Sequence, residues 1–240
     1  MVMEHMPEGP PALAAVPGDE TAAARALRAQ LLATEHWSLL ATRSLSWNES
    51  FSRAGMFLTL LSGATVALAL VAQATAFGDA FSIFALLLLP VVLYVGVATY
   101  VRLTEINNED LVWVRGMNRL RRAYLELDPD LARHFVTGTT EDAEGFMQTY
   151  GAPMKGSAFL HGLVTTPTTI GVVNAAVAAV LLSILATKVG GTMGSVAVVG
   201  VLTFVAACVI EAWFGYRTVA MVEYGRAARD RAARAPEEGG

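Results

Sequence analysis

Four long runs of apolar residues divide the chain. They span roughly 54–77, 81–101, 158–187 and 196–215. Each run reaches the length of about 20 residues that a helix needs to cross the hydrocarbon core of a bilayer. A buried helix of a soluble protein normally keeps a polar stripe, yet 57–76 contains no ionisable residue. The pattern predicts an all-α integral membrane protein with four transmembrane helices.

The connections between the runs predict two hairpins with helical extensions. Only a few residues separate the first run from the second, and the third from the fourth. The expected organisation is a disordered N-terminus at 1–19, a cytoplasmic helix at 20–53, the first transmembrane hairpin at 54–101, a cytoplasmic helical extension at 102–127, a linker with short helices at 128–157, the second transmembrane hairpin at 158–215, and a cytoplasmic helix with a disordered tail at 216–240.

Apolar residues at alternating spacings of three and four flank the first hairpin on both sides. This coiled-coil-like spacing predicts that both spans continue as helices into a cytoplasmic stalk. The first seam is Trp37, Leu40, Ser44, Trp47, Phe51, Ala54 and Leu58, and the second is Leu103, Ile106, Asp110, Trp113, Met117, Leu120, Tyr124 and Leu127. Within the second seam we expect Trp113, Met117, Leu120 and Tyr124 to form an assembly seam. Thr21 or Asp19 is the expected N-cap of the first helix, and Thr139 with Asp142 predicts a short helix that ends at Tyr150.

Charge sets the expected orientation. Arginines precede the first run, fill the segment between the second and third, and follow the fourth, whereas Lys188 alone falls in a short connecting loop. Basic residues near membrane helices stay in the cytoplasm, so both termini and the middle segment are expected there. The arginine-rich, alanine-rich composition favours a multi-pass protein of a bacterial inner (plasma) membrane.

No sequence motif in the chain indicates enzymatic activity. The chain has one cysteine, Cys208, and its histidines show no spacing typical of a metal site. No nucleophile motif or phosphate-binding glycine loop stands near the spans. We therefore expect no catalytic residues, no metal, no cofactor and no nucleic acid. The expected partners are the lipid bilayer and further copies of the chain, with a cytoplasmic protein as a further candidate partner.

Polar residues inside the third and fourth runs are the candidate pore residues, because such groups need a partner in the membrane. They are Asn174, Thr165, Thr166, Thr169 and Glu211. Asn174 has two interpretations, a hydrogen bond across a helix interface or a pore-lining amide. The threonines flank Pro167, which predicts a kinked helix entrance. Glu211 is expected to pair with Arg217, Arg53 or Arg102 or to extend to the membrane interface. The alternative is a proton-relay carboxylate.

Acidic residues directly below the second span are candidates for a cytoplasmic mouth. Glu105, Glu109 and Asp110 would form a ring of negative charge in an oligomer, and such rings concentrate cations. The alternative is a solvated helix face balanced by Arg102 and Arg115. Asp110 lies on the apolar seam, where a buried polar group would fix helix register.

The leading hypothesis is a homo-oligomeric channel or pore-like ion conduit gated from the cytoplasmic side. Four helices barely enclose a cavity, so we expect the ion path at an oligomer axis, with small residues such as Gly63 and Gly171 allowing close helix contact. One alternative is a non-conducting scaffold that recruits a partner through the stalk. The layout of a cytoplasmic helix, two spans and a trailing helix also resembles that of two-span effectors of bacterial antiviral systems, which implies a pore-forming defence effector.

Overall fold

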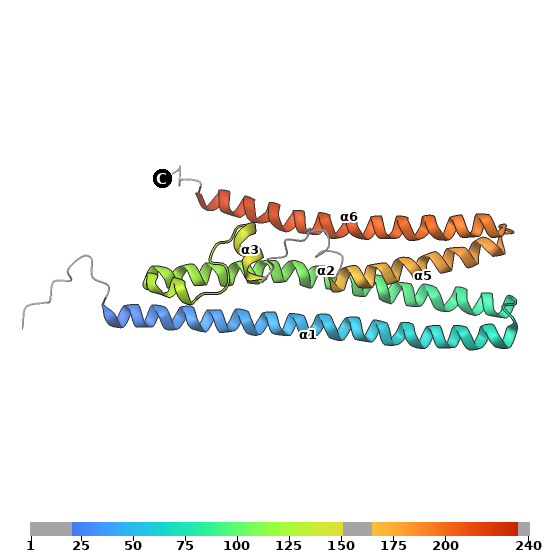
Figure 1. Ribbon diagram of the computed structural model, residues 1–240, viewed down its shortest axis with the longest axis horizontal. Coiled ribbons are helices and arrows are strands. Elements are labelled where there is room, and N and C mark those ends of the chain that lie inside the picture. Colours follow the sequence, from blue (N-terminus) through green and yellow to red (C-terminus); the bar gives the residue numbers. More distant parts are fainter. Residues whose placement is uncertain (1–20, 151–164, 235–240) are drawn as a thin grey trace, which may run out of the picture.

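The computed structural model describes residues 21–150 and 165–234 (Figure 1). Within them every regular element is helical, and four helices are long and apolar enough to cross a membrane. The expected disordered segments, 1–19 and the tail 236–240, lie outside the described residues, as do the linker residues 151–157 and the first residues of the third run, 158–164.

The first two helices are much longer than a membrane is thick. α1 covers Ala22–Thr75 and α2 covers Asp79–Leu127, so at 1.5 Å per residue α1 is about 80 Å long. Thr21 begins α1 by accepting a hydrogen bond from the Ala24 amide at 3.3 Å. The chain then reverses through Ala76 and Phe77, both in the left-handed region. We call 22–53 and 102–127, which lie beyond the apolar stretches, the stalk.

The remaining elements are the 3-10 helix η1 (Pro129–His134), α3 (Ala143–Thr149), α5 (Thr166–Lys188) and α6 (Met193–Arg234). Asp142 caps α3 by accepting a hydrogen bond from the Gly145 amide at 2.8 Å. The prediction of a kink at Pro167 is wrong, because α5 begins at Thr166 and places this proline in its first turn. There the missing N–H would have no helical partner anyway.

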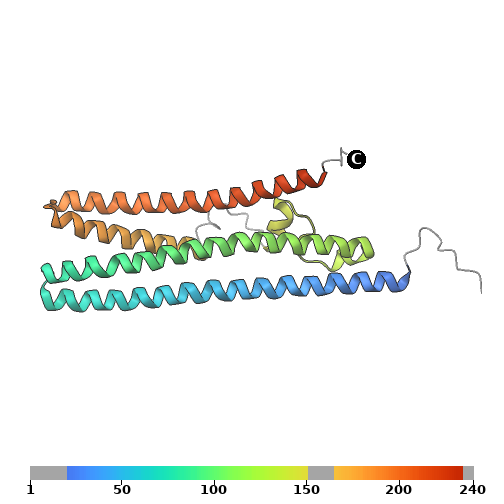
Figure 2. The same cartoon turned by 180° about the vertical axis from the view of Figure 1, so that it is seen from behind.

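The long helices lie in a row, in the order α1, α2, α5, α6 (Figures 1 and 2). Each packs against its neighbour in that order, and α1 and α6 form the two edges. The turns between α1 and α2 and between α5 and α6 lie at one end of the row, which we call the turn end. The stalk, η1 and α3 lie toward the other end.

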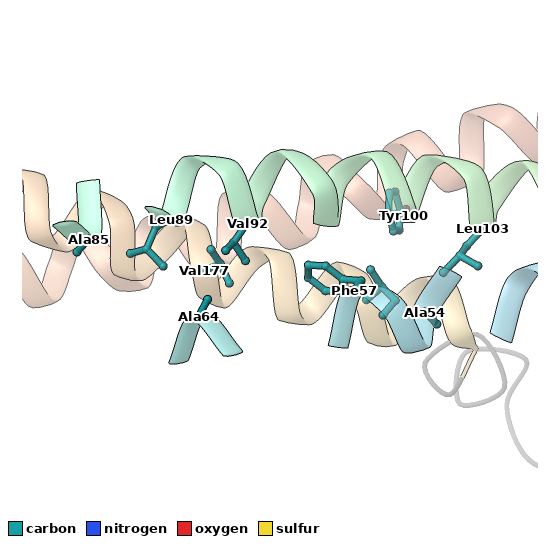
Figure 3. Packing of buried hydrophobic residues seen from close by; sticks show 10 residues of the cluster. Ala54, Phe57, Ala64, Ala85, Leu89, Val92, Tyr100, Leu103 and Val177 are labelled. Carbon is teal, nitrogen blue, oxygen red and sulfur yellow. The ribbon is translucent and has the colours of Figure 1, made fainter. Parts of the chain in front are cut away.

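The core runs along the middle of the row. Phe57, Leu89, Val92 and Val177 pack between α1, α2 and α5 (Figure 3). Ala64 and Ala85 let the helix backbones approach closely, which stabilises helix pairs where lipid replaces water. In the stalk, buried Val114 and Met117 continue this core.

The two seams predicted from the spacing face in different directions. The α2 seam points inward, with Leu103 and Met117 almost fully buried. The α1 seam points largely outward, since Trp37 is 71% exposed and Phe51 58%. The face of α1 that packs against α2 is instead the one that carries Arg43. Arg43 forms an ion pair with Asp110 on α2. An ion pair therefore sets the rotation of α1 in the stalk.

Candidate functional site

Three helices bring polar groups together within the apolar part of the row. The Asn174 amide on α5 donates to the Glu211 carboxylate on α6, with Nδ2 and Oε1 3.5 Å apart. The Tyr100 hydroxyl on α2 donates to the backbone oxygen of Glu211 at 2.6 Å. We call Tyr100, Asn174 and Glu211 the polar triplet. It combines two residues that the sequence indicated with a tyrosine that it did not.

Two glycines make room for the polar triplet. A Cβ at Gly171 would lie 2.7 Å from Oε2 of Glu211 and 3.3 Å from the Tyr100 ring. A Cβ at Gly96 would lie 2.0 Å from Oδ1 of Asn174 and 2.8 Å from the Phe57 ring. Side chains at these positions would push α2, α5 and α6 apart, so both glycines are required by the close approach.

Asn174 is only 2% exposed, and its Oδ1 has no hydrogen-bond partner in the described part of the chain. This oxygen faces Gly96 and the Phe57 ring. A buried amide oxygen without a partner costs free energy.

Glu211 lies at a groove between α2 and α6 whose floor is α5. The groove has a volume of about 310 Å³ and is otherwise almost wholly apolar. It is lined by Leu93, Val97, Tyr100, Val101, Asn174, Ala178, Ala207, Ile210, Glu211 and Phe214. The carboxylate is therefore the one ionisable acid among these lining side chains.

The basic residues expected to pair with Glu211 have other partners. Arg53 and Arg102 both bind Glu49, at 2.7 and 3.0 Å. Arg217 stacks over the Trp213 ring, 5.1 Å from its centroid. No ion pair to Glu211 exists among the side chains that the structure describes. A carboxylate in such surroundings is stable only when a proton or a cation neutralises it.

A second cavity opens between the hydrophobic helices toward the turn end. It has a volume of about 600 Å³, and its polar lining comes from Ser82, Ser183, Thr187 and Lys188. Lys188 also binds Asp79 at 2.5 Å, which links the ends of α5 and α2. Between this cavity and Gly96 on α2 lie Leu89 and Val92, both buried. An apolar layer thus separates the cavity from the polar triplet.

The threonine cluster lies at the start of α5. The hydroxyls of Thr165 and Thr168 are 2.9 Å apart, and Thr169 donates to the Thr165 backbone oxygen at 3.2 Å. Thr165 and Thr166 line a cavity of about 240 Å³ beside Asp110 of the stalk and Tyr150 at the end of α3. The cluster therefore belongs to the base of the stalk, apart from the polar triplet.

The mouth candidates Glu105 and Glu109 both accept hydrogen bonds from Arg102, at 3.2 Å each. Arg102 also binds Glu49 through both carboxylate oxygens. These bonds, together with that from Arg53, lower the pKa of Glu49 to about 2. The acidic cluster is thus neutralised largely by arginines of the same chain.

Asp110 is 3% exposed and forms a bidentate ion pair with Arg43, at 2.6 and 3.2 Å. The Tyr150 hydroxyl donates to the same carboxylate, and Arg43 lies over the Tyr150 ring at 5.3 Å. Breaking a buried pair of this kind typically costs about 3–5 kcal/mol. Asp110 therefore joins α1, α2 and the end of the α3 segment.

Asn118 is a fully buried residue of α2 that the sequence reasoning missed. Its Nδ2 donates to the backbone oxygens of Thr140 and Gly145, at 2.8 and 3.0 Å. Its Oδ1 accepts from Arg121 and from the Thr149 hydroxyl, at 2.8 and 2.7 Å. The only signal for Asn118 in the sequence was an amide side chain between the apolar seam residues Met117 and Leu120.

The assembly seam is used largely inside one chain. Met117 is 2% exposed, and the Tyr124 ring contacts the rings of His36 and Phe135 at 6.2 and 6.4 Å. Trp113 and Leu120 are half-buried. This packing leaves little of the seam for another molecule.

Compared with protein-family models, curated proteins and solved structures, the chain matches none of them. In the described part of the chain, no group of three His, Cys, Asp or Glu side chains could hold a metal ion. The polar triplet and its groove are therefore the basis for the functional argument.

Proposed function

We propose that the protein is a homo-oligomeric, multi-pass membrane protein that conducts cations, with Glu211 as the intramembrane cation or proton site. The observation that carries this proposal is a carboxylate in an apolar groove whose expected basic partners bind elsewhere. Retaining an ionisable group at such depth costs free energy. Residues of this kind in membrane helices commonly serve ion or proton transfer.

The polar triplet comes from three helices of one chain, which favours an ion path within each protomer over a path at the oligomer axis. Such a path would run from the 600 Å³ cavity at the turn end, past the layer of Leu89 and Val92, to Glu211. In this proposal the buried Leu89 and Val92 layer is the barrier to water, and ions pass when it opens.

The stalk offers a route for gating from the cytoplasm. α2 runs without interruption from Tyr100, in the polar triplet, to Arg115 in the stalk. Arg115 forms an ion pair with Glu223 on α6, the helix that carries Glu211. A displacement of the stalk would therefore move two of the three helices around the carboxylate.

Flux measurements with purified protein in liposomes test the proposal. Protons and potassium ions should cross under an imposed gradient when Glu211 is present. Glu211→Gln keeps the shape of the side chain but removes its charge, and it should reduce the flux by about tenfold or more. Asn174→Leu should weaken it less, because the amide only orients the carboxylate.

The matched control is Glu35→Gln, which removes a carboxylate from an exposed position on the stalk part of α1. Its flux should equal that of the unchanged protein. Absence of flux across varied ions, pH and voltage, or equal flux in the Glu211 and Glu35 variants, would reject the proposal.

A scaffold that recruits a partner through the assembly seam is the weaker candidate. Met117 and Tyr124 already pack against other parts of the same chain. Recruitment through them would require part of the stalk to open first.

A further inference from the structure

The cavity of about 600 Å³ toward the turn end combines an apolar wall with a charged rim. We call it the turn-end cavity. Phe77 and Val180 in its wall are 72% and 51% exposed, so the cavity opens to the surroundings of the protein. Its volume lies in the range of about 300–1,000 Å³ that is typical of ligand pockets. The apolar lining residues are Phe77, Phe81, Ala179, Val180, Ile184 and Val196.

One ion pair stands at the rim of the turn-end cavity. Asp79 is the one charged residue in 54–101, and Lys188 is the one charged residue in 166–210. The two side chains bind each other at 2.5 Å, and Lys188 lines the cavity. A long basic side chain at the end of an apolar helix extends to the membrane interface. The pair therefore marks the level at which lipid headgroups lie.

Both members of this pair keep hydrogen-bonding capacity for a ligand. A lysine ammonium has three N–H donors and a carboxylate has two acceptor oxygens, and Lys188 uses one donor to bind Oδ1 of Asp79. The Asp79 side chain is 90% exposed and the Lys188 side chain 36%. An exposed ion pair contributes little to stability. Each group can therefore add a further partner at small cost in free energy.

Ser183 supplies another hydrogen-bonding group in the turn-end cavity. Its hydroxyl has no hydrogen-bond partner in the part of the chain that the structure describes, whereas the Thr187 hydroxyl donates to the Ile184 backbone oxygen at 2.6 Å. Ser183 lies five residues before Lys188, about 7.5 Å deeper along α5. The cavity thus offers a hydroxyl donor below its charged rim.

We propose that the turn-end cavity binds a zwitterionic phospholipid with a primary amine in its headgroup, such as phosphatidylethanolamine. The lipid phosphate accepts hydrogen bonds from Lys188, and the headgroup ammonium donates to Asp79. A glycerol ester oxygen, which lies deeper in the bilayer than the phosphate, accepts from Ser183. One acyl chain lies against the apolar wall.

Charge complementarity distinguishes this lipid from others in a bilayer. The rim carries one positive and one negative group, so an anionic phospholipid is attracted by Lys188 but repelled by Asp79. A choline headgroup has no N–H group to donate to the carboxylate. A primary ammonium next to a phosphate matches both charges, and hydrogen bonds between charged groups are roughly twice as strong as those between neutral groups.

The lipid would share the turn-end cavity with the entrance of the proposed ion path, but its binding does not depend on conduction. None of the residues assigned to the lipid belongs to the polar triplet. The buried Leu89 and Val92 lie between the two sites. The lipid site and the conduit can therefore fail separately.

Native mass spectrometry of the protein released from nanodiscs tests the lipid site. The nanodiscs contain equal parts of phosphatidylethanolamine, phosphatidylglycerol and phosphatidylcholine with the same acyl chains. The unchanged protein should retain phosphatidylethanolamine in preference to each of the others by about tenfold or more. Lys188→Gln should abolish this preference, because the phosphate loses its charged donor.

Asp79→Asn gives the sharper result. It leaves Lys188 as the only charge at the rim, so the preference should shift to the anionic phosphatidylglycerol. Arg28→Gln is the matched control, because it removes one member of an exposed ion pair, that with Glu126, in the stalk. Its lipid preference should equal that of the unchanged protein.

Filling the turn-end cavity provides the second measurement. Ala179→Leu adds a larger apolar side chain to the wall, so the bound lipid should be lost. Ala176→Leu is the control, since Ala176 is an exposed residue of the same helix that does not line the cavity. This variant should keep the lipid.

Three results would overturn the inference. They are equal retention of the three phospholipids, a preference of the unchanged protein for phosphatidylglycerol, and equal lipid retention in the Ala179 and Ala176 variants. Glu211→Gln should keep the lipid while it loses ion flux. Flux without a lipid preference would reject the lipid site alone, and a lipid preference without flux would reject the conduit alone.

Discussion

Adding one methyl group at Gly96 should loosen the packing of α2 against α5. The new Cβ would lie 2.0 Å from Oδ1 of Asn174 and 2.8 Å from the Phe57 ring, and both side chains are almost fully buried. Overpacking of this kind costs about 1–3 kcal/mol. Thermal unfolding in detergent, followed by circular dichroism, should show a lower midpoint for Gly96→Ala.

Gly194→Ala is the control for this measurement. At this position on α6 the nearest atom to a new Cβ is the Thr192 hydroxyl, 4.0 Å away. Alanine favours helix over glycine by up to about 1 kcal/mol, so this variant should be unchanged or slightly stabilised. Equal losses in both variants would mean that α2 and α5 do not pack closely at Gly96.

His36 should make the stability of the stalk depend on pH. Burial, and then the charge of Arg121, lower its pKa below the ordinary 6.5. The unfolded chain therefore binds more protons than the folded chain when the pH falls below about 6.5, and stability decreases there. Thermal unfolding from pH 7.5 to 5 should show this loss.

Replacing His36 with phenylalanine should remove that part of the pH dependence while keeping a ring against Tyr124. His134→Phe, at an exposed position on η1, is the control and should retain it. A pH profile that is unchanged in the His36 variant would show that His36 does not contribute to it.

At the scale of elements, α3 depends on Asn118 for its attachment to α2. Asn118→Ala would remove four hydrogen bonds and leave the backbone oxygens of Thr140 and Gly145 without this donor. The Gly145 oxygen keeps the Thr149 hydroxyl at 2.9 Å as a donor, whereas the Thr140 oxygen loses its amide donor. A buried group left unpaired costs on the order of 1–3 kcal/mol. Hydrogen exchange of the α3 amides should accelerate by at least about tenfold, which corresponds to 1.4 kcal/mol.

Gln148→Ala is the matched control on α3 itself, since this exposed amide binds only Glu144 at 3.3 Å among the described residues. Its exchange should remain close to that of the unchanged protein. Slow exchange in the Asn118 variant would mean that other contacts hold α3 in place.

The sequence predicted the elements well because their signals are local. Continuous apolar runs and alternating spacings predicted long helices, and Thr21 caps α1 as expected. The short helix α3 begins three residues later than the Thr139 capping box predicted, because Asp142 itself is the N-cap. The sides on which helices meet could not be predicted in the same way. Arg43 pairs with Asp110, 67 positions away, and this long-range contact turns the apolar seam of α1 outward.

The candidate site was also predictable only in part, because it depends on contacts between residues that are far apart in the sequence. Asn174 and Glu211 could be singled out, because polar groups in apolar runs need partners. Their meeting depends on Gly96 and Gly171, which look like ordinary small residues in sequence. Tyr100 gave no signal and Asn118 only a weak one, since their partners include backbone oxygens of distant segments.

At the scale of the whole molecule, the row has a charged end and a turn end. The stalk and η1 carry arginines at one end. Lys188 is the last residue of α5, and the turn that follows α5 lies at the other end (Figure 1). If the positive end stays in the cytoplasm, a thiol placed at Thr139 should be inaccessible to a membrane-impermeant maleimide in intact cells. The same thiol should react in inverted membrane vesicles.

A thiol at Val189, in the turn between α5 and α6, is the matched control for that labelling experiment. It is 80% exposed and should react in intact cells but not in sealed inverted vesicles. Both variants require the Cys208→Ser background, because Cys208 would otherwise add its own signal. The opposite labelling pattern would place the stalk outside the cell. Gating from the cytoplasm through Arg115 and Glu223 would then be impossible, although the carboxylate of Glu211 could still conduct.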